Sequence, residues 1–510
     1  MPWYFMVFVG KKFIFFPDPY PIVPCQVKPD QIKSKPRHQF ERTTYMFIGR
    51  KTELDFLNKH HATESGQLIV LYGRRRVGKT ETLLEFCKGK EHIYFASSEQ
   101  SDEMQLKAFS QAILQKGHPA SRYIQSFANW TEAFASLQDL PWTGRKLLII
   151  DEFPYMVKCN PTIPSLLQNL WDAKLRHQNL TIILCGSYIS FMENEILDRD
   201  KPLYGRTTAI LKMLPLDFYE AIQFFPNYSV EDKIKAYGVL GGIPHYLKQF
   251  DSSLSLEENI TQQILTRGSI LYSEVEFLLH HELRETSNYN TIIQSIAQGN
   301  SHMNDLHTST QIEKTKLSSY LSNLMDLGIV WREFPTEAPV INQAKGHRGL
   351  YRLSDPFFRF WFRYVFPYLS ELEAGDASSI CSYVVKPDLD VFTYRPYTLV
   401  CHQYLRELNH RNRLPFHFIK IGRWWNKKEM LSVMATDAAK KHFLTGDCWF
   451  NDNVMTLKDA LAIKARVTPE AGVKPYYWLF SKAGFTDELK AAADKEKLNL
   501  VGLEDLLKPE

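Results

Sequence analysis

Residues 67–86 read QLIVLYGRRRVGKTETLLEF, and this stretch decides the fold of the N-terminal half of the chain. The apolar run Leu68–Leu71 predicts a strand, and the segment from Gly73 to Thr80 predicts a glycine-rich loop. A helix is predicted after the loop from the apolar positions Leu83, Leu84 and Phe86. The loop has the spacing G-x-x-x-x-G-K-[ST] in the strand–loop–helix context that phosphate-binding loops require.

The chemistry of this loop follows from its backbone and two side chains. Glycines let successive N–H groups curl around phosphate oxygens, and the positive end of the following helix adds attraction. We expect Lys79 to reach the β- and γ-phosphates of a nucleotide and the Thr80 hydroxyl to bind Mg²⁺. A chance glycine-rich turn is the alternative. The expected nucleotide-binding residues are Gly73, Arg74, Arg75, Arg76, Val77, Gly78, Lys79, Thr80 and Glu81.

A second predicted strand ends in two acids. Residues 146–156 read KLLIIDEFPYM, and four consecutive apolar residues predict a strand buried on both faces, as in a parallel sheet. We expect this strand to lie beside the first. Asp151 at its end can hold Mg²⁺ through water, and Glu152 can polarise a water molecule for in-line attack. The alternative is an acid pair that caps a helix N-terminus.

Two polar residues further along the chain are candidates for contact with the γ-phosphate. The strand in LTIILCGSYISFM, residues 180–192, ends in Ser187, which we expect between the two previous strands; a helix N-cap is the alternative. Arg206 follows a glycine and could act on the γ-phosphate within the chain or from a neighbouring subunit. The alternative for Arg206 is a surface arginine. Pro244, in a Gly-x-Pro element, could contact the nucleotide and couple it to the next domain.

The motifs of residues 46–250 together resemble one family. FIGRKTEL, GRRRVGKT, IIDEFPY, CGSYISFM, PLYGRTT and GGIPHYL resemble the archaeal-type P-loop ATPases of the AAA+/STAND group. The resemblance implies ATP and Mg²⁺ as cofactors. It also implies a parallel five-stranded sheet flanked by helices, a small helical lid, and nucleotide-dependent switching of a following winged helix.

The middle of the chain fits a winged helix. Apolar residues at helical spacing predict three helices within residues 282–332, and LGIVWRE and GLYRLSD then predict a two-stranded wing with a basic loop (Lys345, His347, Arg348) between the strands. The exposed face of the third helix could reach DNA phosphates or base edges through Lys314, Thr315, Lys316, Ser318, Ser319 and Ser322. A lid or a protein contact is the alternative. DPFFRFWFRYVFPYL, residues 355–369, predicts a buried helix between domains, with base stacking as its alternative.

The order of strands and helices after residue 385 resembles a restriction-endonuclease-like domain. A helix is predicted at 397–412, and strands are predicted around 416–426, 430–437 and 441–450. Active members of that superfamily need a helix glutamate, a strand aspartate and an acid-x-lysine pair to hold and use Mg²⁺. Register places these groups at Thr398 or Leu399, Ser432, Asp447 and Trp449, so only Asp447 is present. Glu429 could replace one acid only through a shift of three residues, which would turn it to the opposite face. We therefore expect a fold retained for DNA or protein contact.

Composition describes a globular protein of several domains. The chain has 510 residues, 44% of them hydrophobic and 23% charged, and a formal net charge of +4. This length exceeds one ordinary core, and so small a net charge neither demonstrates nor excludes a nucleic-acid partner. Seven scattered cysteines without CxxC pairs indicate reduced thiols in a cytoplasmic protein and argue against a zinc site. No apolar run reaches the ~18 residues of a membrane span.

The predicted fold class is α/β with five parts. They are an atypical extension at 1–45, a P-loop ATPase core at 46–215, a helical lid at 216–275, a winged helix with an aromatic connecting helix at 276–370, and an inactive nuclease-like domain at 385–510. Met46 could itself be the start codon.

The leading functional hypothesis is a Mg²⁺-dependent ATPase that acts as a nucleotide-driven switch. Its expected catalytic residues are Lys79, Glu152, Ser187 and Arg206, and its expected metal ligands are Thr80 and Asp151. An ATP-responsive regulator that binds double-stranded DNA through the winged helix is the alternative, and a metal-dependent nuclease is a third. A protein partner is also compatible with the sequence; a membrane is not expected.

Overall fold

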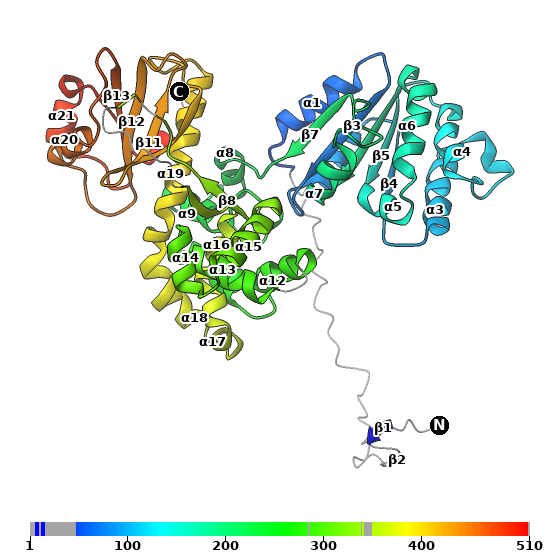
Figure 1. Ribbon diagram of the computed structural model, residues 1–510, viewed down its shortest axis with the longest axis horizontal. Helices are drawn as coiled ribbons and strands as arrows, with labels where there is room; N and C mark the ends of the chain where they lie inside the picture. The colour runs from blue at the N-terminus through cyan, green and yellow to red at the C-terminus, as the bar shows by residue number, and fades with distance from the viewer. Residues whose placement is uncertain are drawn as a thin grey trace, which may run out of the picture. The chain divides into compact units, whose positions relative to one another are not determined.

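The computed structural model (Figure 1) describes residues 6–9, 12–15, 47–283, 286–337, 339–340 and 349–507. The chain divides into two compact units, Met1–Met46 and Phe47–Glu510. In the first unit, β1 (Met6–Val9) pairs antiparallel with β2 (Lys12–Phe15). Most of the extension expected at residues 1–45 lies outside the described residues.

The second unit begins with a five-stranded parallel sheet. The strands lie in the order β4-β5-β6-β3-β7, and every neighbouring pair is parallel. Their bounds are β3 Gln67–Gly73, β4 His92–Ala96, β5 Lys146–Asp151, β6 Leu180–Gly186 and β7 Ala209–Met213. The α/β fold class with a parallel sheet typical of P-loop ATPases is therefore confirmed.

The position of β5 corrects one prediction. We expected this strand to lie beside β3, but β6 lies between the two, pairing with β3 on one side and with β5 on the other. Both β5 and β6 are apolar runs buried on both faces, so their sequences do not tell which one neighbours β3. The expected place of the third strand, between the first two, is confirmed.

Helices cover both faces of this sheet because side chains alternate along each strand. On β3, Ile69 and Leu71 share a hydrophobic core with α1 (Lys51–His61) and α2 (Lys79–Cys87). Leu68 and Val70 point to the other face. That face is covered by α3 (Asp102–Leu114), α4 (Trp130–Ala135), α5 (Phe153–Cys159) and α6 (Ile163–Ala173).

Helices follow β7, as expected for a lid. They are α8 (Phe218–Ala221), α9 (Val230–Leu240), α10 (Pro244–Leu247), α11 (Leu256–Asn259) and α12 (Ile270–Glu282). Gly242, between α9 and α10, lies so close to Leu216 that a Cβ added to it would be 1.9 Å from the Leu216 carbonyl oxygen. The chain after α9 therefore packs directly against the segment that leaves the sheet.

Three helices and a hairpin come next, in the order predicted for a winged helix. They are α13 (Ser287–Ala297), α14 (Met303–Thr310), α15 (Lys314–Asp326), β8 (Val330–Glu333) and β9 (Leu350–Leu353), with β8 and β9 antiparallel. Leu317, Leu321 and Leu324 of α15 are buried, and the polar face named above is exposed. The expected basic loop with Lys345, His347 and Arg348 lies outside the described residues.

The aromatic helix is buried, as predicted. In α16 (Pro356–Tyr364) the side chains of Phe357, Phe358, Phe360, Trp361, Phe362 and Tyr364 are all buried. Two short helices, α17 (Leu369–Glu373) and α18 (Ala377–Ile380), lead from it to α19 (Lys386–His410).

The start of α19 corrects a second prediction. We expected the helix to begin at Tyr397, but it begins at Lys386 and contains Pro396. Proline cannot donate to the carbonyl four residues earlier, here that of Phe392. The Arg359 guanidinium of α16 donates to this carbonyl instead, and the Pro396 ring packs against Gly238 of α9. Contacts from two other helices thus stabilise a continuous α19.

A second five-stranded sheet forms the C-terminal domain. Its order is β10-β11-β12-β13-β14, antiparallel up to β12 and parallel beyond. The bounds are β10 Lys420–Trp425, β11 Met430–Thr436, β12 His442–Trp449, β13 Lys474–Ser481 and β14 Leu498–Val501. One face packs on α19, coloured yellow in Figure 1, and the other on α20 (Leu457–Ala465) and α21 (Asp487–Glu496). The sequence did not predict α21.

Across residues 47–283, 286–337 and 349–507, none of the helices combines the length and apolar character needed to cross a bilayer.

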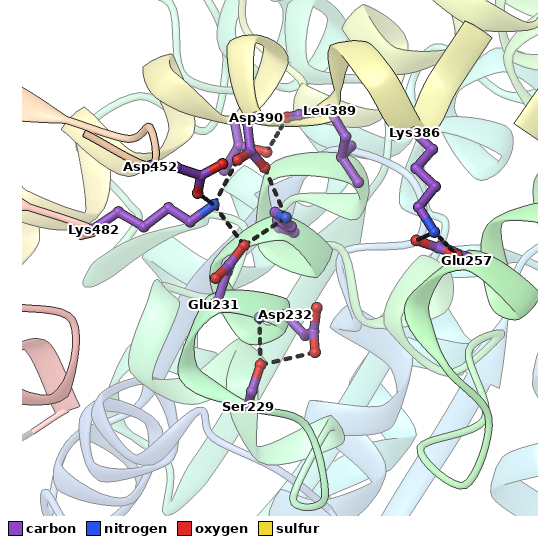
Figure 2. Close-up of polar contacts among 11 residues, drawn as sticks. Ser229, Glu231, Asp232, Glu257, Lys386, Leu389, Asp390, Asp452 and Lys482 are labelled. Carbon is purple, nitrogen blue, oxygen red and sulfur yellow. Dashed lines mark hydrogen bonds and ion pairs between the residues drawn. The ribbon is translucent and has the colours of Figure 1, made fainter. Parts of the chain in front are cut away.

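An ionic network joins α9, α19 and the C-terminal domain (Figure 2). The Lys482 ammonium, at the end of β13, lies 2.5 Å from Asp390 Oδ2, 2.8 Å from Glu231 Oε1 and 3.0 Å from Asp452 Oδ1. Lys235 of α9 bridges Glu231 and Asp390 at 2.7 Å each. Burial by itself would lower the pKa of Lys482, but its carboxylate partners raise that pKa above its ordinary value.

Lys482→Met should destabilise the protein by about 1–3 kcal/mol, because it leaves partly buried carboxylates short of one positive charge. Urea unfolding followed by circular dichroism measures the loss. Lys490→Met is the matched control, since Lys490 contacts only the exposed Asp487, at 3.4 Å; a change within about 0.5 kcal/mol is expected there. Equal losses in the two variants would contradict a role for the network in stability.

Candidate functional site

The loop between β3 and α2 lies at the carboxyl end of the central part of the sheet. Arg76 and Gly78 have φ values of 66° and 95°, in the left-handed region that glycine adopts without strain. Gly73 has no room for a side chain, because an added Cβ would lie 2.5 Å from the Met213 carbonyl oxygen. This backbone curls the loop so that α2 begins at Lys79, two residues inside the segment that we expected to be loop.

A pocket of about 500 Å³ opens in front of the loop, within the ~300–1,000 Å³ range of small-molecule sites. Of the ten residues predicted to contact the nucleotide, Pro244 included, six line it: Arg75, Arg76, Gly78, Lys79, Thr80 and Glu81. Glu152 and Ser187 also line it. Gly73, Arg74, Val77 and Pro244 do not reach it. Two apolar residues of α12, Phe277 and Leu278, complete the wall, and Phe277 is exposed despite its size.

Lys79 is buried and lies over its own loop. Its ammonium donates to the carbonyl oxygens of Gly73 and Arg74, at 3.0 Å each. Burial lowers the pKa of this lysine, and the neighbouring acids Glu152 and Asp151 offset part of the effect. A phosphate contact would replace the two carbonyl contacts.

Thr80 and Asp151 lie together, as predicted for a shared metal. The Thr80 hydroxyl donates to Asp151 Oδ2 at 2.8 Å, and Tyr94 of β4 donates to the same oxygen at 2.5 Å. Burial and the charge of Asp151 raise the pKa of Tyr94, so this phenol stays a donor. Sequence reasoning missed Tyr94, because a tyrosine in a strand carries no signal of its partner.

Glu152 and Ser187 form a pair across the ends of β5 and β6. The Ser187 hydroxyl donates to Glu152 Oε1, and within the described residues the buried Oε2 of Glu152 has no hydrogen-bond partner. Glu152 has a φ of 51°, a conformation that costs of order 1–3 kcal/mol outside glycine. The N-cap alternative for Ser187 is wrong, since Tyr188 and not Ser187 occupies the N-cap position of the next helix, α7 (Ile189–Phe191). Glu152 stands at the N-cap of α5 but makes no side-chain capping bond.

The three arginines of the loop point to three different places. Arg74 forms an ion pair with Asp355, whose other oxygen caps α16, and its guanidinium lies 4.7 Å from the centre of the Phe358 ring. Arg75 donates to the hydroxyls of Tyr188 and Tyr155, which follow β6 and β5 in the same domain, at 3.1 and 3.4 Å.

Arg76 contacts α10 and α12. Its guanidinium lies 2.5 Å from Glu274 Oε2 of α12 and 2.6 Å from Nε2 of His245. Glu274 is 1% exposed, and burial raises its pKa to about 7 although Arg76 and Arg74 attract the charged form. Sequence reasoning missed both Glu274 and Asp355, because they lie far from the loop in the chain.

Pro244 and Arg50 support the loop from two sides. The Cγ of Pro244 lies 3.6 Å from the position of a Cβ added to Gly78, so the Gly-x-Pro element packs on the loop. Its expected contact with a nucleotide stays a prediction. Arg50, 2% exposed, donates to the Val77 carbonyl oxygen at 2.6 Å and to the Leu214 carbonyl oxygen at 2.7 Å. We did not predict a role for Arg50, although it lies in the quoted FIGRKTEL motif.

Arg206 is not brought to the pocket. It pairs with Asp172 of α6 at 3.0 Å and donates to the Tyr204 carbonyl oxygen at 3.1 Å. Its side chain is one-third exposed. Within one chain this placement fits the surface-arginine alternative.

Asp447 of the C-terminal sheet is held by protein groups. It accepts a hydrogen bond from Ser432 and lies 3.0 Å from the guanidinium of Arg466. The register that places Ser432 and Asp447 side by side is therefore the one expected, and an arginine occupies the space beside the acid. Within the described part of the chain, no group of three or more His, Cys, Asp and Glu side chains is arranged to hold a metal.

Comparison with known proteins agrees with this geometry. Residues 47–250 match a family described as "ATPase domain predominantly from Archaea", and residues 361–462 match "Archaea bacterial proteins of unknown function". The chain is 32% identical over 452 residues to the uncharacterized protein MJECL04 of Methanocaldococcus jannaschii, a match that covers 88% of this chain and 98% of that protein. An uncharacterized ATP-binding protein of the same organism, MJ0423, is 48% identical over 46 residues, 9% of this chain and 78% of its own length.

Among solved structures, the Walker-type ATPase PABY2304 of Pyrococcus abyssi is similar, with a TM-score of 0.47 and 21% identity. The match covers 62% of this chain and 96% of that one.

The sheet order, the loop and the first family match together define residues 47–250 as a P-loop ATPase domain. The identity to MJECL04 extends over nearly all of both chains. The protein therefore belongs to the same family as MJECL04.

Glu274→Gln should change how stability depends on pH. In the folded protein the pKa of Glu274 is raised from 4.5 to about 7, so the folded state binds more protons than the unfolded state between these values, and stability falls as pH rises through them. Between about pH 4.5 and about pH 7 the wild type should lose up to about 3 kcal/mol of stability relative to Glu274→Gln. Its Tm should fall relative to that of the variant over the same pH range. Calorimetry without nucleotide checks this, and a flat or rising difference would contradict it.

Proposed function

We propose that the protein is a nucleotide-driven switch, a Mg²⁺-dependent ATPase whose state is passed to the segments after its core. The observation that carries this proposal is Arg76, which lines the pocket and is paired with Glu274 of α12. Phosphate oxygens are strong acceptors for arginine. A bound nucleotide would compete with Glu274 for this guanidinium and so change the contact that holds α12.

The roles proposed for the site residues follow from their contacts. Lys79 would exchange its two carbonyl contacts for the β- and γ-phosphates. Glu152, held at Oε1 by Ser187, has Oε2 available to accept a proton from the attacking water. Ser187 would then act mainly by orienting Glu152. Arg206 could act only on a nucleotide of a neighbouring subunit, unless its pairing with Asp172 changes.

The residues at the pocket fit Mg²⁺. Thr80 and Asp151 supply hard oxygen ligands, and Mg²⁺ in nucleotide sites takes its other ligands from phosphates and water. Thr80 would bind the ion directly and Asp151 through water. The ion would neutralise charge on the phosphates.

The remaining domains are proposed to respond to the nucleotide. We assign the lid to residues 216–275, a winged helix to 276–370 and a nuclease-like domain without cleavage activity to 385–510. The pairing of Asp447 with Arg466 supports the lack of cleavage, since the guanidinium already balances the carboxylate. The packing of Pro244 on Gly78 supports coupling, because α10 starts at the loop itself.

Glu152→Gln should lower ATP turnover by about 10²–10⁴-fold while nucleotide binding is kept, because it removes the proposed general base without removing phosphate contacts. Phosphate release and the affinity for a fluorescent ATP analogue measure the two effects, with and without duplex DNA. Glu85→Gln is the control, since Glu85 lies on the surface of α2 and pairs with Lys88. Unchanged turnover in Glu152→Gln would refute the assignment.

A second candidate function is DNA binding controlled by ATP. The observation that favours it is the exposed polar face of α15, which presents Lys314 and Lys316 near the start of the helix. Exposure of a helix face in this position is what contact with a DNA groove would need.

Replacing Lys314 and Lys316 together by Ala should weaken duplex DNA binding uniformly across sequences. A plot of log binding constant against log salt concentration has a negative slope, and each lost phosphate contact should make this slope about 0.9 less steep. Filter binding over a salt series, with ATP and with ADP, measures the slope. Lys51→Ala is the control, because Lys51 is exposed on α1 and pairs with Asp55. If DNA binds in neither nucleotide state, this candidate function is wrong.

A further inference from the structure

Three arginines from three elements meet at one carboxylate oxygen between the β8–β9 hairpin and the C-terminal sheet. Oε2 of Glu333, in β8, lies 3.1 Å from Arg352 of β9, 3.2 Å from Arg423 of β10 and 3.6 Å from Arg395 of α19. We call these four residues the Glu333 cluster. The distance to Arg395 is too long for a hydrogen bond, so one carboxylate does not satisfy three guanidinium groups.

The cluster carries excess positive charge. Three arginines face one glutamate, which leaves a net charge of +2 within the cluster. The nearby acid Asp447 is already paired with Arg466, at 3.0 Å. Burial lowers the pKa of Arg395 well below its ordinary value, and the charges of Arg352, Arg359 and Arg423 lower it further although Glu333 opposes them. Positive charges in such surroundings are costly unless an anion joins them.

The arginines remain within reach of a ligand. The exposed fraction of the side chain is 10% for Arg423, 15% for Arg352 and 22% for Arg395. Each guanidinium has five N–H donors in a fixed plane, and Glu333 uses few of them. Several guanidinium groups from separate elements match the tetrahedral oxygens of a phosphate group better than a single carboxylate does.

An exposed aromatic side chain lies on the same face. Trp331 is the direct cross-strand partner of Arg352, so their side chains point to one face of the hairpin. Trp331 is 42% exposed. An exposed indole beside a positively charged site is suited to stacking on a nucleic-acid base.

We propose that the Glu333 cluster is an anion-binding site for a phosphate group, with Arg352, Arg395 and Arg423 as donors. The phosphate could belong to a nucleic-acid strand or to free inorganic phosphate. Trp331 favours the strand. This site is separate from the ATP pocket, and it does not require that the protein hydrolyses ATP.

The first test is binding of a short fluorescent single-stranded oligonucleotide over a salt series. The Arg395→Met and Arg423→Met double variant should bind at least about tenfold more weakly, and its salt slope should fall by about 0.7 for each lost contact. Arg411→Met is the matched control, because it removes one charge from the exposed end of α19, where Arg411 pairs with Glu407; it should bind like wild type. The Lys314→Ala and Lys316→Ala variant separates this site from α15.

The second test uses inorganic phosphate and keeps the proposal falsifiable if the double variant folds poorly. In a Lys79→Ala background, which weakens phosphate binding at the loop, phosphate should raise Tm relative to chloride at equal ionic strength. Glu333→Gln should enlarge this shift, because the competing carboxylate is neutralised. A purely structural ion cluster would instead lose stability in Glu333→Gln and gain no response to phosphate.

The outcomes separate the two sources. Oligonucleotide binding that depends on Arg395 and Arg423 supports a nucleic-acid strand, and a Tm response to phosphate without oligonucleotide binding supports a small phosphate ligand. The proposal is overturned if oligonucleotide affinity is the same with and without Arg395 and Arg423 and if Glu333→Gln does not change the Tm shift caused by phosphate.

Discussion

The three consecutive arginines of the loop between β3 and α2 set the constraint on which the rest of the structure depends. Together with Lys79, they concentrate positive charge that negatively charged groups must balance. Without nucleotide the chain supplies that balance itself, with Glu274 of α12 for Arg76 and Asp355 at the start of α16 for Arg74. The core is thereby tied to elements that follow it in the chain, and one of these two arginines, Arg76, also lines the pocket in front of the loop.

Burial decides how firm these ties are. Glu274 is almost fully buried and loses much of its solvation, which raises its pKa to about 7 even beside Arg76, so near neutral pH neither its charged nor its neutral form is strongly favoured. Such a contact can be exchanged at modest cost. The ionic network around Lys482 differs, because its acids keep partial access to water and the pKa values of Glu231 and Asp390 are lowered. The protein thus combines a weak ion pair beside the phosphate-binding loop, Arg76–Glu274, with a stronger ionic network around Lys482 at the C-terminal domain.

The sequence predicted the parts of the site that depend on local spacing. The loop, the acids at the end of β5 and the pairing of Ser432 with Asp447 follow from motifs and strand register. Three features of the site could not be predicted: the acidic partners of the loop arginines, the contact of Tyr94 with Asp151, and the role of Arg50. All of these contacts are made between segments distant in the chain. The predicted place of β5 and the predicted start of α19 were wrong for a related reason. The apolar strands β5 and β6 have similar sequences, and Pro396 is accommodated within α19 through contacts with Arg359 and Gly238, which are distant in the chain.

The hydrogen bond from Arg359 to the Phe392 carbonyl oxygen also bears on how the chain folds. Around Pro396, α19 lacks one of its own backbone hydrogen bonds, so this helix is not self-sufficient as an isolated peptide. The missing donor is on α16, which leaves the ribosome first because synthesis runs from the N-terminus. The helix that supports the C-terminal sheet would therefore complete its hydrogen bonding only on docking to an element already made, which favours a sequential order of assembly.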